Sequence, residues 1–164
     1  MLIFGGTGFL GRHLCAALFA NGQKATVVSR APDKKFVAAM SPHISALTLK
    51  EFQAHETQLL EEHNTIIYAA SLSVPSTFVN TPWLEYEKNV QPAMQLFCKA
   101  SQINKNMRVV FISSGGTIYG THHTQPIKED ALVQPISPYG LGKATIEQGL
   151  EYLGRTLDLD YCIL

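Results

Sequence analysis

The feature that most constrains this chain is a run of glycines between a short apolar segment and an amphipathic one. The apolar residues Met1–Phe4 lead into Gly5-Gly6-Thr7-Gly8-Phe9-Leu10-Gly11, and residues 9–21 continue with helical character. Glycines three residues apart let the backbone turn sharply, approach a pyrophosphate and pack a helix closely on a strand. The N–H groups and positive dipole end of the helix would then face the phosphates. The pattern predicts a dinucleotide site, with an ordinary strand-to-helix turn as the alternative. The contacts expected from this turn are Gly5, Thr7, Gly8, Phe9, Leu10 and Gly11.

Short apolar segments alternate with amphipathic ones along the whole chain. Strands are predicted at residues 2–4, 25–28, 44–49, 65–68, 109–112 and 161–164, and helices at 9–21, 55–63, 83–103 and 138–156. This alternation predicts an α/β fold, a doubly wound parallel sheet of the Rossmann type, forming one NAD(P)-binding domain over residues 1–164. The chain stops inside an apolar strand pattern. We therefore expect it to be the amino-terminal part of a longer polypeptide, truncated before a substrate domain.

Composition and charge exclude several classes of partner. The 13 basic and 13 acidic residues cancel, so a neutral chain gives no electrostatic reason to bind nucleic acid or an anionic membrane. No apolar run reaches transmembrane length, and we expect no signal peptide. The three cysteines are scattered, which favours a reducing, cytoplasmic location. The pair His122-His123 lies in a polar loop and is interpreted as solvated, so no metal site is predicted.

The end of the second predicted strand bears on the choice of nicotinamide nucleotide. NAD-selective folds usually place an acid about 20 residues beyond the glycine turn, where it bonds the ribose 2′-hydroxyl. Here Ser29 and Arg30 occupy that position, and no acid occurs before Asp33. A hydroxyl and a guanidinium suit a 2′-phosphate, so the sequence favours NADP over NAD. The alternatives are that Arg30 is solvated or stacks on the adenine.

A second motif carries acid–base chemistry. Tyr139 and Lys143 are four residues apart in a predicted helix, so they share a face. A phenol with an ordinary pKa near 10 is a poor base at neutral pH, but a nearby ammonium stabilises the phenolate. The pair therefore predicts a general acid/base that takes a proton from an alcohol or sugar hydroxyl.

A third segment, Ser113-Ser114-Gly115-Gly116-Thr117-Ile118-Tyr119-Gly120, follows the fifth predicted strand. The carboxyl ends of strands are where open α/β sheets bind ligands, so hydroxyls here could bond the reacting oxygen. The alternative is a turn whose serines cap backbone groups.

Together these motifs resemble the extended short-chain dehydrogenase/reductase family, within the group of nucleotide-sugar epimerases and dehydratases. The resemblance implies that Tyr139 is the base, and that Lys143 binds the nicotinamide ribose and tunes Tyr139. It implies that Asn89 supports the active site, and that the segment after the fourth strand lies along the cofactor. The residues of that segment are Ala69, Ala70 and Ser71.

One position departs from the family pattern. Where related epimerases have a catalytic Ser or Thr, this chain has Gly115. Either Ser114 or Thr117 must supply the hydroxyl. We favour Ser114 for catalysis and Thr117 for substrate contact.

By resemblance, the expected function is an NAD(P)-dependent nucleotide-sugar epimerase of the 4-epimerase type. Dehydratases of the family carry an Asp-Glu pair in the segment occupied here by residues 115–117, so its absence favours an epimerase or a reductase. The alternative is an NADP-dependent carbonyl or 4-keto-sugar reductase, which a firmly NADP-selective site would favour because an epimerase retains its nucleotide. A non-catalytic dinucleotide sensor would not need the Tyr-Lys pair.

The family also implies partners. The substrate is expected to be a nucleotide sugar, with most of its pocket in a carboxy-terminal region outside this chain. Cofactor binding without turnover is therefore one expectation for these 164 residues. The predicted helices 83–103 and 138–156 are expected to form a four-helix bundle in a homodimer.

Overall fold

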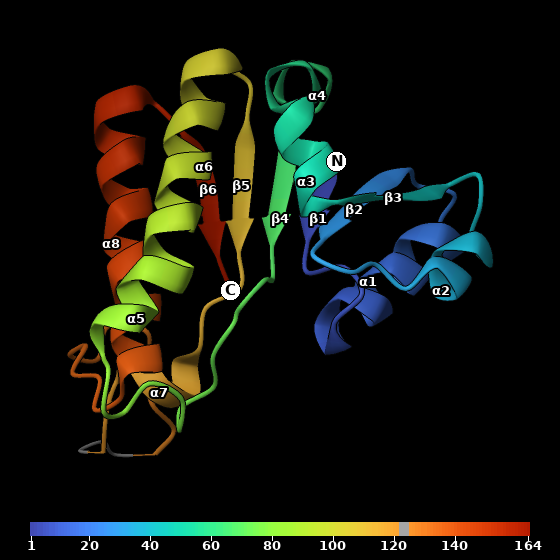
Figure 1. The fold of residues 1–164 in the computed structure, drawn as a ribbon. Helices are drawn as coiled ribbons and strands as arrows, with labels where there is room; N and C mark the ends of the chain where they lie inside the picture. Colours follow the sequence, from blue (N-terminus) through green and yellow to red (C-terminus); the bar gives the residue numbers. More distant parts are fainter. Residues whose placement is uncertain (122–124) are drawn as a thin grey trace.

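The computed structural model describes residues 1–121 and 125–164. These residues form a six-stranded parallel sheet with the strand order β3-β2-β1-β4-β5-β6 (Figure 1). The order reverses between β1 and β4, which is the point where doubly wound sheets open a crevice at their carboxyl edge. The predicted fold class is confirmed. The strands are β1 (Leu2–Phe4), β2 (Ala25–Ser29), β3 (Ile44–Thr48), β4 (Thr65–Tyr68), β5 (Arg108–Phe111) and β6 (Asp160–Ile163).

Helices cover the sheet on both faces. One buried apolar cluster joins the sheet to α1 (Phe9–Ala20) and α2 (Lys34–Ala38). The other joins the opposite face to α3 (Leu49–Ala54), α4 (Glu56–Glu62), α6 (Gln91–Ile103) and α8 (Pro138–Leu157). The short helix α5 (Trp83–Glu85), the π-helical segment η1 (Tyr86–Val90) and the helix α7 (Gly115–Ile118) complete the described elements. Both α5 and α7 lie near the carboxyl edge of the sheet (Figure 1).

The alternation of side chains along β1 explains why both faces must be covered. Leu2 and Phe4 point into one cluster and Ile3 into the other, and all three are buried. A strand buried on both faces has to be continuously apolar, as it is in parallel sheets. The short strand that precedes the glycine run is therefore central to the fold.

Two predicted elements differ from the structure. The third strand ends at Thr48, because the Thr48 hydroxyl accepts a hydrogen bond from Glu51 N and the Glu51 carboxylate accepts one from Thr48 N, which starts α3. The predicted continuous helix 83–103 is divided by η1. Pro92, in the first turn of α6, has no N–H to continue the α-helical bonding, which is consistent with the irregular turn before it.

Other boundaries agree closely with the sequence analysis. Helix α1 ends at Ala20 with Asn21 as its C-cap, and Gly22 follows with φ +65°, as the predicted cap pair requires. Strands β5 and β6 each begin and end one residue earlier than predicted. The His122-His123 interpretation falls outside the described residues. Across residues 1–121 and 125–164, no helix combines the length and apolar character needed to span a membrane.

Candidate cofactor and catalytic site

A cleft of about 830 Å³ opens at the carboxyl ends of β1, β2 and β4. It therefore lies at the point where the strand order reverses, the expected place for a ligand in a doubly wound sheet. Many of the predicted cofactor contacts line it: Gly5, Thr7, Gly8, Ser29, Arg30, Ala69, Ala70, Ser71 and Asn89.

The glycine turn is built by close backbone contacts. Gly5 has φ +83°, and a Cβ there would lie 2.8 Å from Ala70 N. A Cβ on Gly11 would lie 2.3 Å from Gly5 O, so the helix can approach the turn only because residue 11 has no side chain. Gly8 is the N-cap of α1, and no side chain caps its first turn. The helix N-terminus therefore keeps N–H donors available for an anion at the cleft.

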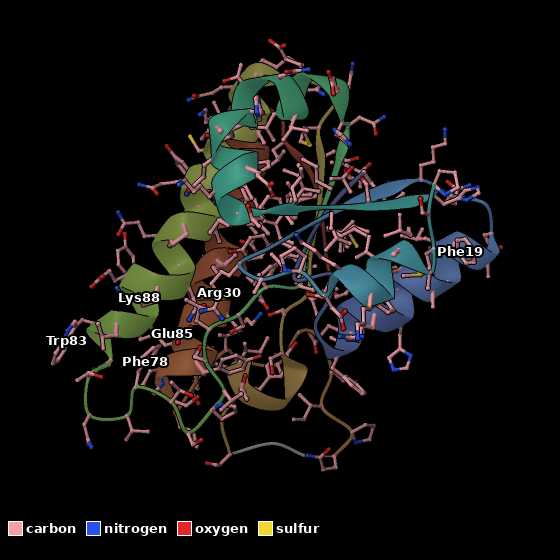
Figure 2. The ribbon with its side chains drawn as sticks, turned by 45° about the vertical axis from the view of Figure 1, so that its right-hand side comes forward. Phe19, Arg30, Phe78, Trp83, Glu85 and Lys88 are labelled. Atoms are coloured by element: carbon pink, nitrogen blue, oxygen red, sulfur yellow. The ribbon has the colours of Figure 1, made fainter. Side chains whose placement is uncertain are left out.

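The end of β2 joins this turn at the cleft. The Thr7 and Ser29 hydroxyls lie 3.4 Å apart. Arg30 lines the cleft together with Lys88, and both are labelled in Figure 2. The nearby acid Asp33 caps α2 and pairs with Arg12 at 2.7 Å, and the Arg12 hydrogen bond is the main cause that lowers the pKa of Asp33. The carboxylate of Asp33 therefore interacts with Arg12 and with the start of α2, and Asp33 does not line the cleft.

Asn89 ties the loop after β4 to the helical layer. Its Oδ1 accepts a hydrogen bond from Leu72 N at 2.8 Å. Its Nδ2 donates to the Ser73 hydroxyl and to Glu85 Oε1, each at 3.0 Å. Asn89 is buried within η1, and π-helical turns often occur at functional sites. The amide therefore fixes the cleft wall at Leu72.

Tyr139 and Lys143 lie one turn apart at the start of α8, where the Ser137 hydroxyl accepts a hydrogen bond from Gly140 N. Lys143 Nζ lies 5.6 Å from the centroid of the Tyr139 ring and 4.7 Å from that of Phe111. It donates a 2.7 Å hydrogen bond to Ile112 O, directly after β5. The ammonium group is thereby held between the phenol and the carboxyl end of the sheet.

Lys143 is only 6% exposed. Burial lowers its pKa to about 8, although the carboxylates of Glu85 and Glu147 oppose this change. The lysine therefore remains mainly an ammonium at neutral pH, the form that stabilises a phenolate. Two other phenols near this region are poorer candidates for a base. Burial raises the pKa of Tyr68 to about 12, and burial followed by nearby carboxylates raises that of Tyr119.

The hydroxyls after β5 differ in their bonding. The Ser113 hydroxyl donates to Glu147 Oε1, so it is engaged with α8. Thr117 Oγ1 donates to Ser114 O at 3.2 Å. The Ser114 hydroxyl makes no hydrogen bond to any described residue, although Ser114 is the N-cap of α7. Gly115 and Gly116 leave open space where a Cβ would stand.

The remaining predicted contacts lie outside the cleft lining. Phe9 and Leu10 expose their side chains at the start of α1, so only their backbone could face a phosphate. Ser114, Thr117, Tyr139 and Lys143 belong to the neighbouring region around β5, α7 and α8. Sequence reasoning missed two acids that surround Lys143. Glu147 could have been found because it continues the four-residue spacing of Tyr139 and Lys143, whereas nothing in the sequence marks Glu85 as buried.

The sequence model described as "NAD dependent epimerase/dehydratase family" matches residues 1–164, the full length of this chain. The chain belongs to the NAD dependent epimerase/dehydratase family. The glycine turn, the cleft at the sheet reversal and the Tyr-Lys pair thus occur together in a chain that belongs to this family.

Individual members of the epimerase/dehydratase family support this assignment. A UDP-glucose 4-epimerase from Bacillus subtilis is 28% identical over 99% of this chain and 50% of its own length. A Thermotoga maritima UDP-glucose 4-epimerase, solved with UDP-glucose, has a TM-score of 0.80 and 26% identity, covering 99% of this chain and 53% of its own. A Thermus thermophilus UDP-glucose 4-epimerase, solved with NAD, has a TM-score of 0.84 and 25% identity over the same shares. The chain therefore spans about half the length of these relatives.

Proposed function

We propose that residues 1–164 are the cofactor-binding and base-bearing half of an NAD(P)-dependent nucleotide-sugar epimerase that acts at C4 of the sugar. The observation that carries the proposal is the placement of Tyr139 beside the buried Lys143, at the edge of the sheet that also forms the cleft. A dinucleotide sensor would need the cleft and would have no use for a buried ammonium next to a phenol.

The residues of the cleft suit a dinucleotide. Gly8 and the uncapped start of α1 would hold the pyrophosphate, because backbone N–H groups and the helix dipole attract an anion there. Ser29 and Arg30 would face the adenosine ribose, and Ala69 to Ser71 would lie along the nucleotide. When bound, the nicotinamide supplies a hydride acceptor and donor.

The protein's own part in the reaction is the movement of one proton. Tyr139, as the phenolate that Lys143 stabilises, takes the proton of the sugar hydroxyl at the carbon to be oxidised. After the sugar is reduced from its other face, Tyr139 returns that proton to the new hydroxyl. Ser114 would orient the reacting oxygen, since its hydroxyl is not engaged with another described residue, and Thr117 would contact the substrate.

A Tyr139→Phe variant tests the base. In the polypeptide that contains these residues, we expect turnover of UDP-glucose to UDP-galactose to fall about a hundredfold or more, with little change in the affinity for NAD or NADP. Tyr152→Phe is a matched control on the exposed side of the same helix and should retain activity. Full turnover by Tyr139→Phe would refute the assignment of the base.

The NADP preference that the sequence favours is also a proposal. Arg30 places a cation along the cleft, whereas Lys88 is paired with Glu87 at 2.5 Å and Asp33 is engaged with Arg12. We expect NADP to bind more tightly than NAD, and Ser29→Asp to reverse that order because a carboxylate repels a 2′-phosphate. An unchanged ratio of the two dissociation constants in Ser29→Asp would exclude Ser29 as the selecting residue.

The guanidinium of Arg30 also favours a second candidate, an NADP-dependent reductase of a carbonyl or 4-keto-sugar substrate. A reductase consumes one NADPH and one proton for each substrate reduced, whereas an epimerase interconverts two sugars without net change in its nucleotide. Absorbance of NADPH during turnover therefore separates the two functions. A stoichiometric loss would favour the reductase.

The proposed partners are a nucleotide sugar and a second copy of the chain. Trp83, Tyr86 and Tyr152 are 63%, 59% and 58% exposed on the helical layer of α5, η1 and α8. Trp83 points away from the ribbon in Figure 2. Large exposed aromatic side chains of this kind are enriched in protein interfaces, which supports a bundle between two copies. The proposed location is the cytoplasm, because all three cysteines are unpaired.

A further inference from the structure

Glu85 is a buried carboxylate that the mechanism above does not use. It is only 4% exposed and lies at the end of α5 (Figure 2). One of its oxygens, Oε1, accepts the 3.0 Å hydrogen bond from Asn89, whereas Oε2 is buried without a partner among the described residues. A carboxylate buried with one oxygen unbonded is costly unless a cation lies nearby.

Helix α8 has a gap that fits this carboxylate. A Cβ on Gly142 would lie 2.7 Å from both Cγ and Oε1 of Glu85. The acid therefore packs directly on α8, at the residue that precedes Lys143. Any side chain at position 142 would push the carboxylate away from this part of the helix.

The charged groups around Lys143 come from two elements. Glu85 belongs to α5, whereas Glu147 and the phenol of Tyr139 belong to α8. Of the two carboxylates, Glu85 opposes the effect of burial on the Lys143 pKa more strongly. Glu147 is also bonded to Ser113, and Lys143 Nζ donates to Ile112 O, so Glu85 is the nearby acid that keeps one oxygen unbonded and acts on the ammonium across the contact of α5 with α8 rather than through a direct ion pair.

We propose that Glu85 is a positioning residue, which acts as the counter-ion of Lys143 and as the anchor of the Asn89 amide. One oxygen orients Asn89, which in turn fixes Leu72 N in the cleft wall. The negative charge of the same carboxylate, packed on α8 at Gly142, favours the ammonium form of Lys143. The catalytic consequence rests on the proposed function, because it assumes that Tyr139 depends on a protonated Lys143.

Titration of Lys143 by NMR tests the proposal without any substrate. The 164-residue chain would be labelled at lysine Cε, and the Lys143 resonance assigned with a Lys143→Arg variant. Glu85→Gln keeps the size and the Asn89 hydrogen bond but removes the charge. We expect it to lower the pKa of Lys143 by about one unit or more, and Glu85→Asp to preserve most of the wild-type value. Glu151→Gln is the matched control, because Glu151 is a surface carboxylate on the same helix, and it should cause no change.

An unchanged Lys143 titration in Glu85→Gln would overturn the proposal, as would an equal drop in Glu151→Gln. If Glu85→Gln does not fold, Gly142→Ala decides, since its methyl group displaces the carboxylate and should lower the Lys143 pKa in the same direction. An unchanged titration in Gly142→Ala would then overturn it. The titration needs neither nucleotide nor turnover. An unchanged Lys143 pKa would therefore reject the role of Glu85 without rejecting the proposed function, and a failed activity test would reject the proposed function without rejecting the role of Glu85.

Discussion

At the scale of single residues, Gly11 shows how tightly the nucleotide turn is packed. A methyl group there would lie 2.3 Å from Gly5 O and 2.5 Å from Gly6 Cα, both backbone atoms that cannot move independently. We predict that Gly11→Ala lowers the free energy of unfolding by about 2–3 kcal/mol, as overpacking does. Gly115→Ala is the matched control, because its methyl group meets open space, and urea denaturation should place it within about 0.5 kcal/mol of wild type. Equal stabilities of the two variants would contradict this packing.

Lys143 should leave a signature in the pH dependence of stability. Its pKa is about 8 in the folded chain and 10.5 as the ordinary value. At pH values between about 8 and 10.5, Lys143 is protonated to a greater extent in the unfolded chain than in the folded chain. The contribution of Lys143 to the free energy of unfolding therefore rises with pH, by at most about 3 kcal/mol. We predict that urea denaturation at pH 7.5 and 9.5 shows wild type gaining stability relative to Lys143→Met. A constant difference between the two proteins would mean that the lysine is not buried as described.

At the scale of elements, α8 serves two roles on its two sides. Its buried side carries Lys143 toward the site, and its exposed side carries Tyr152. A charge at the exposed position should disfavour the proposed bundle without disturbing the core. We predict a dimer of the wild-type chain by light scattering at micromolar concentration and a monomer for Tyr152→Glu, with nucleotide affinity retained. A wild-type monomer would count against the bundle.

The elements also show what the sequence could and could not predict. Strong periodic or continuous apolar patterns predicted the strands and the long helices, and the glycine run predicted the turn geometry. The short helices α2 and α3 were not predicted, because each is defined by a local side-chain cap, Asp33 for α2 and Thr48 for α3. The contact of Glu85 with α8 was not predicted for another reason. It joins residues 57 positions apart through a gap at Gly142, which no local pattern reveals.

At the scale of the whole molecule, the reversal of strand order organises the site. The glycine turn after β1, the Ser29-Arg30 pair after β2 and the loop after β4 meet at one cleft. The Tyr-Lys pair reaches the same edge of the sheet from α8, through the Lys143 bond to Ile112 O. Segments far apart in the sequence are thus brought to one edge because all the strands are parallel.

The most direct test of this arrangement is calorimetric titration of the chain with NAD and NADP, compared between wild type and Gly8→Asp. Gly8 is the N-cap of α1 with extended backbone, a position that aspartate favours, and a Cβ there would lie 3.2 Å from Gly5 O, so the variant should fold after a small adjustment of the turn. Its carboxylate would occupy the place proposed for the pyrophosphate. We predict binding of at least one of the two nucleotides by wild type and a loss of about a hundredfold or more in Gly8→Asp, with a smaller loss in the uncharged control Gly8→Asn. Equal nucleotide affinity in wild type and Gly8→Asp, or no binding by folded wild-type chain, would contradict the assignment of the cleft.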